Sequence, residues 1–149
     1  MCNKGKTQAR LCEVVLEKIW RVDSGKKLVK EKYSSVNLSW VVERQNRVQF
    51  ISINPGRCIF CDIGHVSKKI EQSEWINITK EEQKKRKFFL ELRSRFYAQR
   101  DCFPPGKYVI QAAVYSENAP KIEKKFKITW TGNWKETEEE MFGKELKIE

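Results

Sequence analysis

The residues best suited to chemistry are two cysteines and a histidine near the middle of the 149-residue chain. Cys58, Cys61 and His65 have the spacing C-x2-C-x3-H. Two thiolates and an imidazole can share one tetrahedral Zn²⁺, and a fourth ligand would come from Cys2, Cys12 or Cys102. The pattern is incomplete as a zinc motif, because no second pair of spaced cysteines follows it. The three residues are therefore only candidates for a metal site, and no cofactor is expected.

The same cysteines allow two other interpretations. Residues 57–66 fit an extended strand, in which Cys58 and Cys61 would point to opposite faces and could not chelate one ion. Five cysteines is an odd number, so at least one is unpaired or links two chains. A disulfide and buried free thiols both stay open. The candidates for a disulfide are Cys12, Cys58, Cys61 and Cys102.

Acid–base and nucleophilic catalysis find little support in the sequence. His65 is the only histidine, and the patterns G-x-S-x-G, H-E-x-x-H and the phosphate-binding P-loop do not occur. The twenty carboxylates show no spacing that singles out a catalytic pair. We therefore expect a protein that is not an enzyme.

Basic residues interleaved with aromatic ones form a candidate contact surface between residues 84 and 100. Lysine and arginine neutralise phosphates and aromatic rings stack on bases, so the segment fits a nucleic-acid-binding module. Arginine and aromatic residues are also typical of protein interfaces, and no RNP, KH, zinc-finger or helix-turn-helix signature is present. The predicted partner-binding residues are Arg93, Arg95, Phe96, Tyr97 and Arg100, and Lys84–Lys87 extend the basic run.

Length and composition favour one globular domain with a charged surface. The chain is 40% hydrophobic and 34% charged, and it is long enough to form a core without metal or disulfide help. The net charge is +10, but residues 135–149 contain six Glu and three Lys and so carry −3, which leaves +13 on the rest. We expect a domain at 1–134 and an acidic tail at 135–149. Apolar tail residues that could dock on the body or a partner are Met141, Phe142, Leu146 and Ile148.

The elements that position these residues are predicted to be β-strands. The clearest is a hairpin at 106–134, whose arms alternate apolar and polar residues around the turn 117–120. The apolar face of its second arm consists of Ile122, Phe126, Ile128 and Trp130. Residues 9–20 fit another strand, with one side formed by Leu11, Glu13, Val15, Glu17 and Ile19. A hairpin alone cannot bury its apolar face, so a second layer is expected. Further strands are expected at 33–42, 48–53 and 57–66.

Residues 80–99 allow both a helix and a strand. A capping-box spacing at Thr79 and Glu82 favours a helix, in which Phe88, Leu92 and Phe96 recur every fourth residue. However, its first two turns would present no apolar residue to a core. We favour a strand, which gives about seven in all, the number typical of an immunoglobulin-like sandwich. The predicted class is therefore all-β, an antiparallel immunoglobulin-like β-sandwich; a helix at 80–99 would make it α+β.

The stretch Phe-Pro-Pro-Gly-Lys-Tyr-Val-Ile, residues 103–110, resembles the entry to the penultimate strand of bacterial and archaeal immunoglobulin-like accessory domains. The intracellular proteinase inhibitor family of the subtilisin type is one such group. The resemblance covers residues 75–116, and no inhibitory loop can be matched in this chain. It therefore implies a fold and not an activity.

Function is expected to lie in surface recognition. We predict a non-enzymatic protein-interaction module with an accessory, inhibitory or assembly role, viral or archaeal in type; the alternative is a basic nucleic-acid-binding module. A Lys- and Glu-rich surface is also frequent in heat-adapted proteins. No apolar run approaches the roughly 20 residues of a membrane-spanning helix, and no signal peptide is visible. The cytoplasm is therefore the expected location, with an exported chain that has lost its leader as the alternative.

Overall fold

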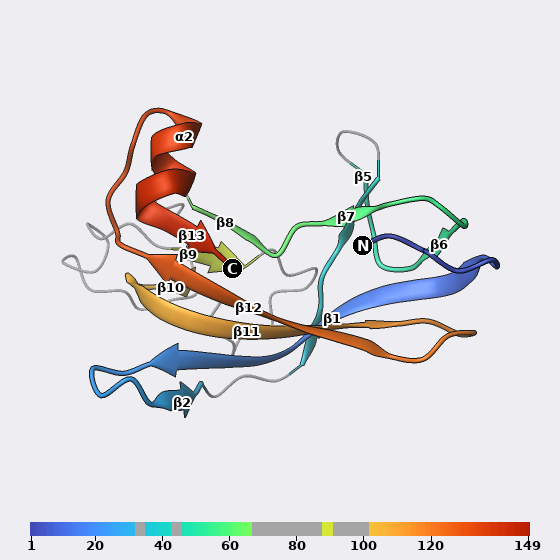
Figure 1. Cartoon of the computed structure of the whole chain (residues 1–149), viewed down its shortest axis with the longest axis horizontal. Coiled ribbons are helices and arrows are strands. Elements are labelled where there is room, and N and C mark those ends of the chain that lie inside the picture. The colour runs from blue at the N-terminus through green and yellow to red at the C-terminus, as the bar shows by residue number, and fades with distance from the viewer. Residues whose placement is uncertain (32–34, 43–45, 67–87, 91–101) are drawn as a thin grey trace, which may run out of the picture.

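A computed structural model shows the architecture of the chain and describes residues 1–31, 35–42, 46–66, 88–90 and 102–149 (Figure 1). The described strands form one large and two small sheets, and every strand pairing in them is antiparallel. The predicted all-β class is confirmed. The closed seven-stranded immunoglobulin-like sandwich stays a prediction.

The large sheet holds seven strands and the two small sheets hold three each. The strands of the large sheet are β1 (Ala9–Val22), β2 (Leu28–Lys30), β3 (Val36–Asn37), β6 (Ile51–Ile53), β11 (Gly106–Tyr115), β12 (Ile122–Trp130) and β13 (Leu146–Ile148). Its order is β13–β12–β11–β1–β2, and β3 and β6 also pair with β1. The strands of the small sheets are β4 (Trp40–Val42), β5 (Asn46–Val48), β7 (Phe60–Cys61), β8 (Gly64–Val66), β9 (Phe88–Leu90) and β10 (Cys102–Phe103). Their orders are β5–β4–β7 and β10–β9–β8.

The hairpin of β11 and β12 has the register that its alternation predicts. The two strands pair without interruption from Gly106 opposite Trp130 to Val114 opposite Ile122. The side chain of Asn118, in the turn, accepts a 2.9 Å hydrogen bond from the backbone of Arg10 and donates one of 2.8 Å to Gln8. The turn is therefore tied to the start of β1.

A β-bulge at Glu17 decides which residues of β1 face the core. The register between β1 and β11 shifts between Leu16 and Lys18, so two residues of β1 lie opposite one of β11. The residues buried on either side of the bulge are Cys12, Val14, Leu16 and Ile19. The prediction that Ile19 shares the face of Glu13 is wrong, because the bulge shifts the two-residue alternation by one position.

Trp40 joins the small β5–β4–β7 sheet to the large one. Its side chain is fully buried, and the indole Nε1 donates a 2.8 Å hydrogen bond to the backbone oxygen of Cys12 in β1. Leu38 and Ile53 are fully buried in the same cluster. The core therefore lies between the inner face of the large sheet and the chain that carries β3 and β4.

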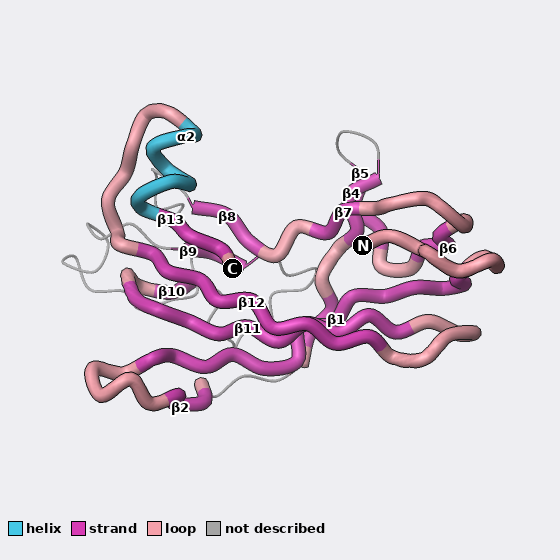
Figure 2. The backbone as a smooth tube through the Cα atoms, in the orientation of Figure 1, coloured by secondary structure: helices cyan, strands magenta, loops and turns pink. Residues whose placement is uncertain are grey.

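Residues 135–149 fold against the large sheet. Thr137 caps the helical turn α2 (Glu138–Glu140), which continues as a π-helical turn, η2 (Met141–Glu145), and then as β13 at the sheet edge (Figure 2). Glu145 is buried, and its carboxylate accepts hydrogen bonds from Thr131 and Asn133. The acidic segment 135–149 therefore continues the large sheet through β13.

The ambiguous segment 80–99 contains one described stretch. Phe88–Leu90 is strand β9, which pairs with β8 on one side and with β10 on the other. A continuous helix over 80–99 is therefore excluded, and the strand interpretation is confirmed at these three residues. The rest of 80–99 lies outside the described residues.

Candidate protein-binding groove

The inner face of β12 passes from buried core to open surface along its length. Trp130 and Ile128 are 1% and 2% exposed, Phe126 is half-buried and Ile122 is 54% exposed. The segment of α2, η2 and β13 covers the Trp130 end of the strand. Towards Ile122 the same apolar face lines a groove.

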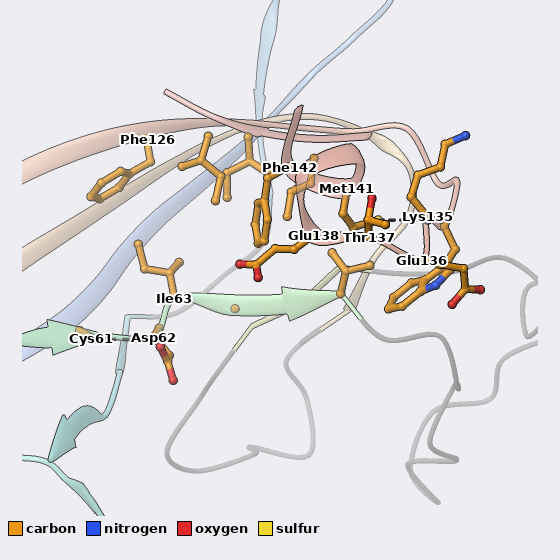
Figure 3. A pocket seen from close by; sticks show the side chains of 16 residues that line it. Cys61, Asp62, Ile63, Phe126, Lys135, Glu136, Thr137, Glu138, Met141 and Phe142 are labelled. Atoms are coloured by element: carbon orange, nitrogen blue, oxygen red, sulfur yellow. Dashed lines mark hydrogen bonds between the residues drawn. The ribbon is translucent and has the colours of Figure 1, made fainter. Parts of the chain in front are cut away.

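The first part of this groove is a hollow of about 560 Å³ between β8, β12 and the C-terminal segment (Figure 3). Its apolar walls include Ile63, Val66, Phe126, Met141, Phe142 and Ile148. The exposed carboxylates of Asp62 and Glu138 lie at the hollow as well. Figure 3 shows the Glu138 side chain next to the Phe142 ring, above β8. Glu136 and Lys135 line the hollow too, so its apolar walls are accompanied by three carboxylates and one lysine.

A second hollow, of about 460 Å³, adjoins the first. The two share Cys61, Ile63 and Phe126, so they lie side by side, and together they are named the apolar groove. The second hollow continues along β12 and β11 towards the N-terminus, where its walls include Val14, Trp40, Phe60, Val114, Ile122 and Lys124.

Four large apolar side chains along the apolar groove are more than half exposed. Phe60 is 74% exposed, and the other three are Ile122, Phe142 and Ile148. Single exposed apolar residues are common on protein surfaces. Four that border one groove are different, because a contiguous apolar patch is typical of an interaction site.

Cys61, where the two hollows meet, is a free thiol. Burial, and then the neighbouring carboxylate of Asp62, raise the pKa of this thiol to about 12. The thiol lies 3.7 Å from the backbone oxygen of Asp62, within reach of a weak S–H hydrogen bond. The thiolate is the nucleophilic form of cysteine, so Cys61 at neutral pH contributes an inert, polarisable wall.

The structure removes Cys58 from the C-x2-C-x3-H pattern as a metal ligand. Cys58 forms a disulfide with Cys2, so its sulfur is no longer a thiolate that could bind zinc beside Cys61. The pairing also differs from the expected one, because Cys2 was not among the four disulfide candidates. His65 lies in β8 with its side chain outside the described part. No group of three His, Cys, Asp or Glu residues among those that the structure describes could hold a metal ion.

The remaining cysteines have different environments. Cys12 is a free, fully buried thiol of β1, and burial raises its pKa. Cys102 lies in β10, and its side chain is outside the described part of the chain. Cys12 is therefore a core residue.

The partner-binding residues predicted from the sequence all fall within 91–101, outside the described residues. Arg93, Arg95, Phe96, Tyr97 and Arg100 stay predictions, as do Lys84–Lys87. Phe142 and Ile148 are among the tail residues expected to dock on the body or a partner, and this stays a prediction; Phe60 and Ile122 were not singled out from the sequence as binding residues. The sequence feature that could have singled out Phe60 is its place as a large aromatic residue between two cysteines.

Comparison with protein families, curated proteins and solved structures finds no match. Within the described residues, no helix has the length and apolar character needed to cross a membrane. Because fold class alone does not indicate function, we infer the function from the residues of the apolar groove.

Proposed function

We propose that the protein is a non-enzymatic protein-binding module that holds an apolar segment of a partner protein in the apolar groove. The observation that carries this proposal is the set of four apolar side chains, each more than half exposed, that line two adjoining hollows. Covering such side chains contributes roughly 25 cal/mol for each Å² removed from water, from which the cost of ordering the two partners is subtracted. Aromatic anchors in pockets are also the typical centres of binding energy in protein interfaces.

Charge at the apolar groove favours a particular kind of segment. Asp62 and Glu138 lie at the first hollow, on a chain whose net charge is +10, and Lys124 lies at the second. Complementary charge sets orientation and excludes wrong partners. The partner segment is therefore expected to carry apolar residues for both hollows and a basic residue beside the first.

The proposal can be tested with a displayed library of random peptides, from which ligands of the full chain are selected. Selected peptides should contain two separated apolar residues, with Lys or Arg next to one of them. Affinity, measured by fluorescence anisotropy, should fall at least about tenfold when Phe60→Gln and Ile122→Gln are combined, the loss typical of truncating an interface anchor. Both residues are mostly exposed, so melting temperature should change little.

The matched control combines Leu28→Gln and Val29→Gln. These residues are similarly exposed but lie on β2, away from the apolar groove. Their substitution should leave peptide affinity unchanged. Equal losses of affinity in both variants would show that the peptides bind exposed apolar residues non-specifically. A chain that binds a fluorescent fatty acid in the groove and selects no peptide would be a lipid carrier, and the proposal would fail.

A further inference from the structure

The outer face of the large sheet, opposite the apolar groove, carries a cluster of lysines. Cross-strand pairing places them in three neighbouring rows: Lys30–Trp20–Val109–Lys127, Lys18–Gln111–Lys125 and Lys107–Thr129–Lys147. The six lysines lie on the same face as Trp20, and these seven residues are named the lysine face. Because cross-strand partners share one side of a sheet, the lysine face is a single surface built from five strands.

Among the described residues, the lysine face has an excess of positive charge, with six lysines and only Glu149 at its border. All six lysines are exposed, and none forms an ion pair with any carboxylate of the described residues. The carboxylates of Glu17 and Glu123, farther along the same face, are both paired with Lys121. Glu149 borders the lysine face opposite Lys127. Lysines two residues apart on one strand are separated by only about 6.8 Å, so a polyanion would relieve their mutual repulsion.

Trp20 adds an aromatic ring to the lysine face, on the strand next to the edge strand β2. The ring is half-buried, and Lys125 Nζ lies 5.5 Å from its centroid. Lys30 is its direct cross-strand partner, and Lys18 lies two residues before it on the same face. An aromatic ring flanked by ammonium groups is the combination that holds a base by stacking and its phosphates by charge.

We infer that the lysine face binds single-stranded nucleic acid, with a base stacked on Trp20 and the phosphates along the lysine rows. The major groove of an undistorted duplex admits an α-helix or a two-stranded ribbon, so a face built from five strands would touch mainly its phosphates. Single strands expose their bases to a ring. An anionic membrane would use the lysines but would not need the ring beside them. This activity is independent of the apolar groove, which lies on the other face of the sheet.

The test is the binding of a labelled oligonucleotide of about 16 nucleotides to the full chain, followed by fluorescence anisotropy between about 50 and 200 mM salt. Combining Lys107→Gln, Lys125→Gln and Lys127→Gln should reduce the slope of log affinity against log salt by about 2, from roughly 0.7 for each lost phosphate contact. Trp20→Leu should weaken binding about 5- to 150-fold with the slope unchanged, because stacking releases no counterions.

The matched control combines Lys4→Gln, Lys6→Gln and Lys144→Gln, three exposed lysines on other parts of the chain. It removes the same charge and should leave slope and affinity nearly unchanged. Trp20→Phe keeps a ring, so it should retain most of the affinity even if Trp20→Leu lowers the melting temperature. The inference is overturned if the control loses as much as the lysine-face variant, or if duplex of the same length binds as tightly. Binding to phosphatidylserine vesicles without oligonucleotide binding would overturn it equally.

Discussion

Cys2 is joined by a disulfide to Cys58, 56 residues later in the chain, next to a wall of the apolar groove. Backbone hydrogen bonds flank the bond on both sides, from Asn3 N to Arg57 O at 3.0 Å and from Ile59 N to Met1 O at 2.8 Å. The N-terminal residues are thereby held beside the chain that leads into β7. Since β7 carries Phe60, the disulfide supports the side chain most exposed at the groove.

Loss of this disulfide is expected to destabilise the fold. Cys58→Ser, or reduction of the wild-type chain, should lower the free energy of unfolding by about 2–4 kcal/mol, because the unfolded chain is no longer constrained by the loop. Urea unfolding with and without reductant measures the change. Cys2→Ser should give the same loss, and combining both substitutions should add little, as they remove one bond. The prediction would be contradicted if the urea midpoint of the wild-type chain were the same with and without reductant.

The Cys2–Cys58 disulfide is of a kind found in two types of location. Stable disulfides are typical of oxidising compartments and also occur inside the cells of hyperthermophiles. A Lys- and Glu-rich surface fits the second case and an exported chain fits the first. The cytoplasmic location therefore stays a prediction.

Gly132 is expected to be the glycine least tolerant of substitution. Its φ is +93°, and a Cβ there would collide with the ring of Pro105. Gly132→Ala should therefore destabilise by at least about 1–2 kcal/mol, the cost of left-handed backbone for a residue with a side chain, with the clash in addition. Thermal unfolding measures the loss.

Gly143 provides the matched control. It lies in η2, and an added Cβ meets no atom within 4 Å. Gly143→Ala should be neutral or stabilise by up to about 1 kcal/mol, because alanine loses less conformational freedom in a helical turn. Equal effects at the two positions would show that backbone conformation does not decide the outcome.

The parts of the fold that were predictable are those encoded locally. Alternation from Ile122 to Trp130 is visible in the sequence because each residue's face follows from its neighbours two positions away. The bulge at Glu17 is not visible, since the alternation of Glu13, Val15 and Glu17 continues without a break. The side chains that bind the Glu17 carboxylate lie in β11 and in the turn after it, about 100 residues later in the chain.

The candidate site was predicted less well, because it depends on distant parts of the chain coming together. Cys2 reaches Cys58 only through the fold, and spacing alone pointed to Cys58 with Cys61. The alternation along β12 predicts that Ile122 is a core residue. In the structure it is exposed, because it lies beyond the part of β12 that α2, η2 and β13 cover. No local pattern distinguishes a covered apolar face from an open one.

Glu17 is expected to make folding stability depend on acid pH. Its carboxylate accepts hydrogen bonds from Tyr115 at 2.6 Å and Gln111 at 2.9 Å and pairs with Lys121 at 2.6 Å. The contact with Lys121, then the Tyr115 hydroxyl, hold the pKa of this carboxyl below its ordinary value. A lowered folded pKa contributes stability that is complete above the unfolded pKa of about 4.3 and is lost as pH falls from there through the folded value.

Glu17→Gln should therefore flatten part of the decline in unfolding free energy below about pH 4.3. The measurement is urea unfolding at a series of pH values. Glu145, whose pKa is also lowered, chiefly by its hydrogen bond from Thr131, should account for a further part. Glu138→Gln, at an exposed carboxylate, is the control and should leave the profile unchanged. A Glu17→Gln profile parallel to the wild type would rule out this role.

Cys61 gives a direct chemical readout of the apolar groove. Because burial raises its pKa to about 12, its alkylation by iodoacetamide should increase about tenfold per pH unit from pH 7 to 9, with no plateau near the ordinary thiol value of about 8.5. Mass spectrometry of the Cys61 peptide measures the rate, and fully buried Cys12 should stay unmodified until urea unfolds the chain. A rate that levels off near pH 8.5 would place Cys61 in open solvent. A peptide that fills the groove should slow the reaction further, since Cys61 lines both hollows, whereas a peptide bound elsewhere would leave the rate as it was.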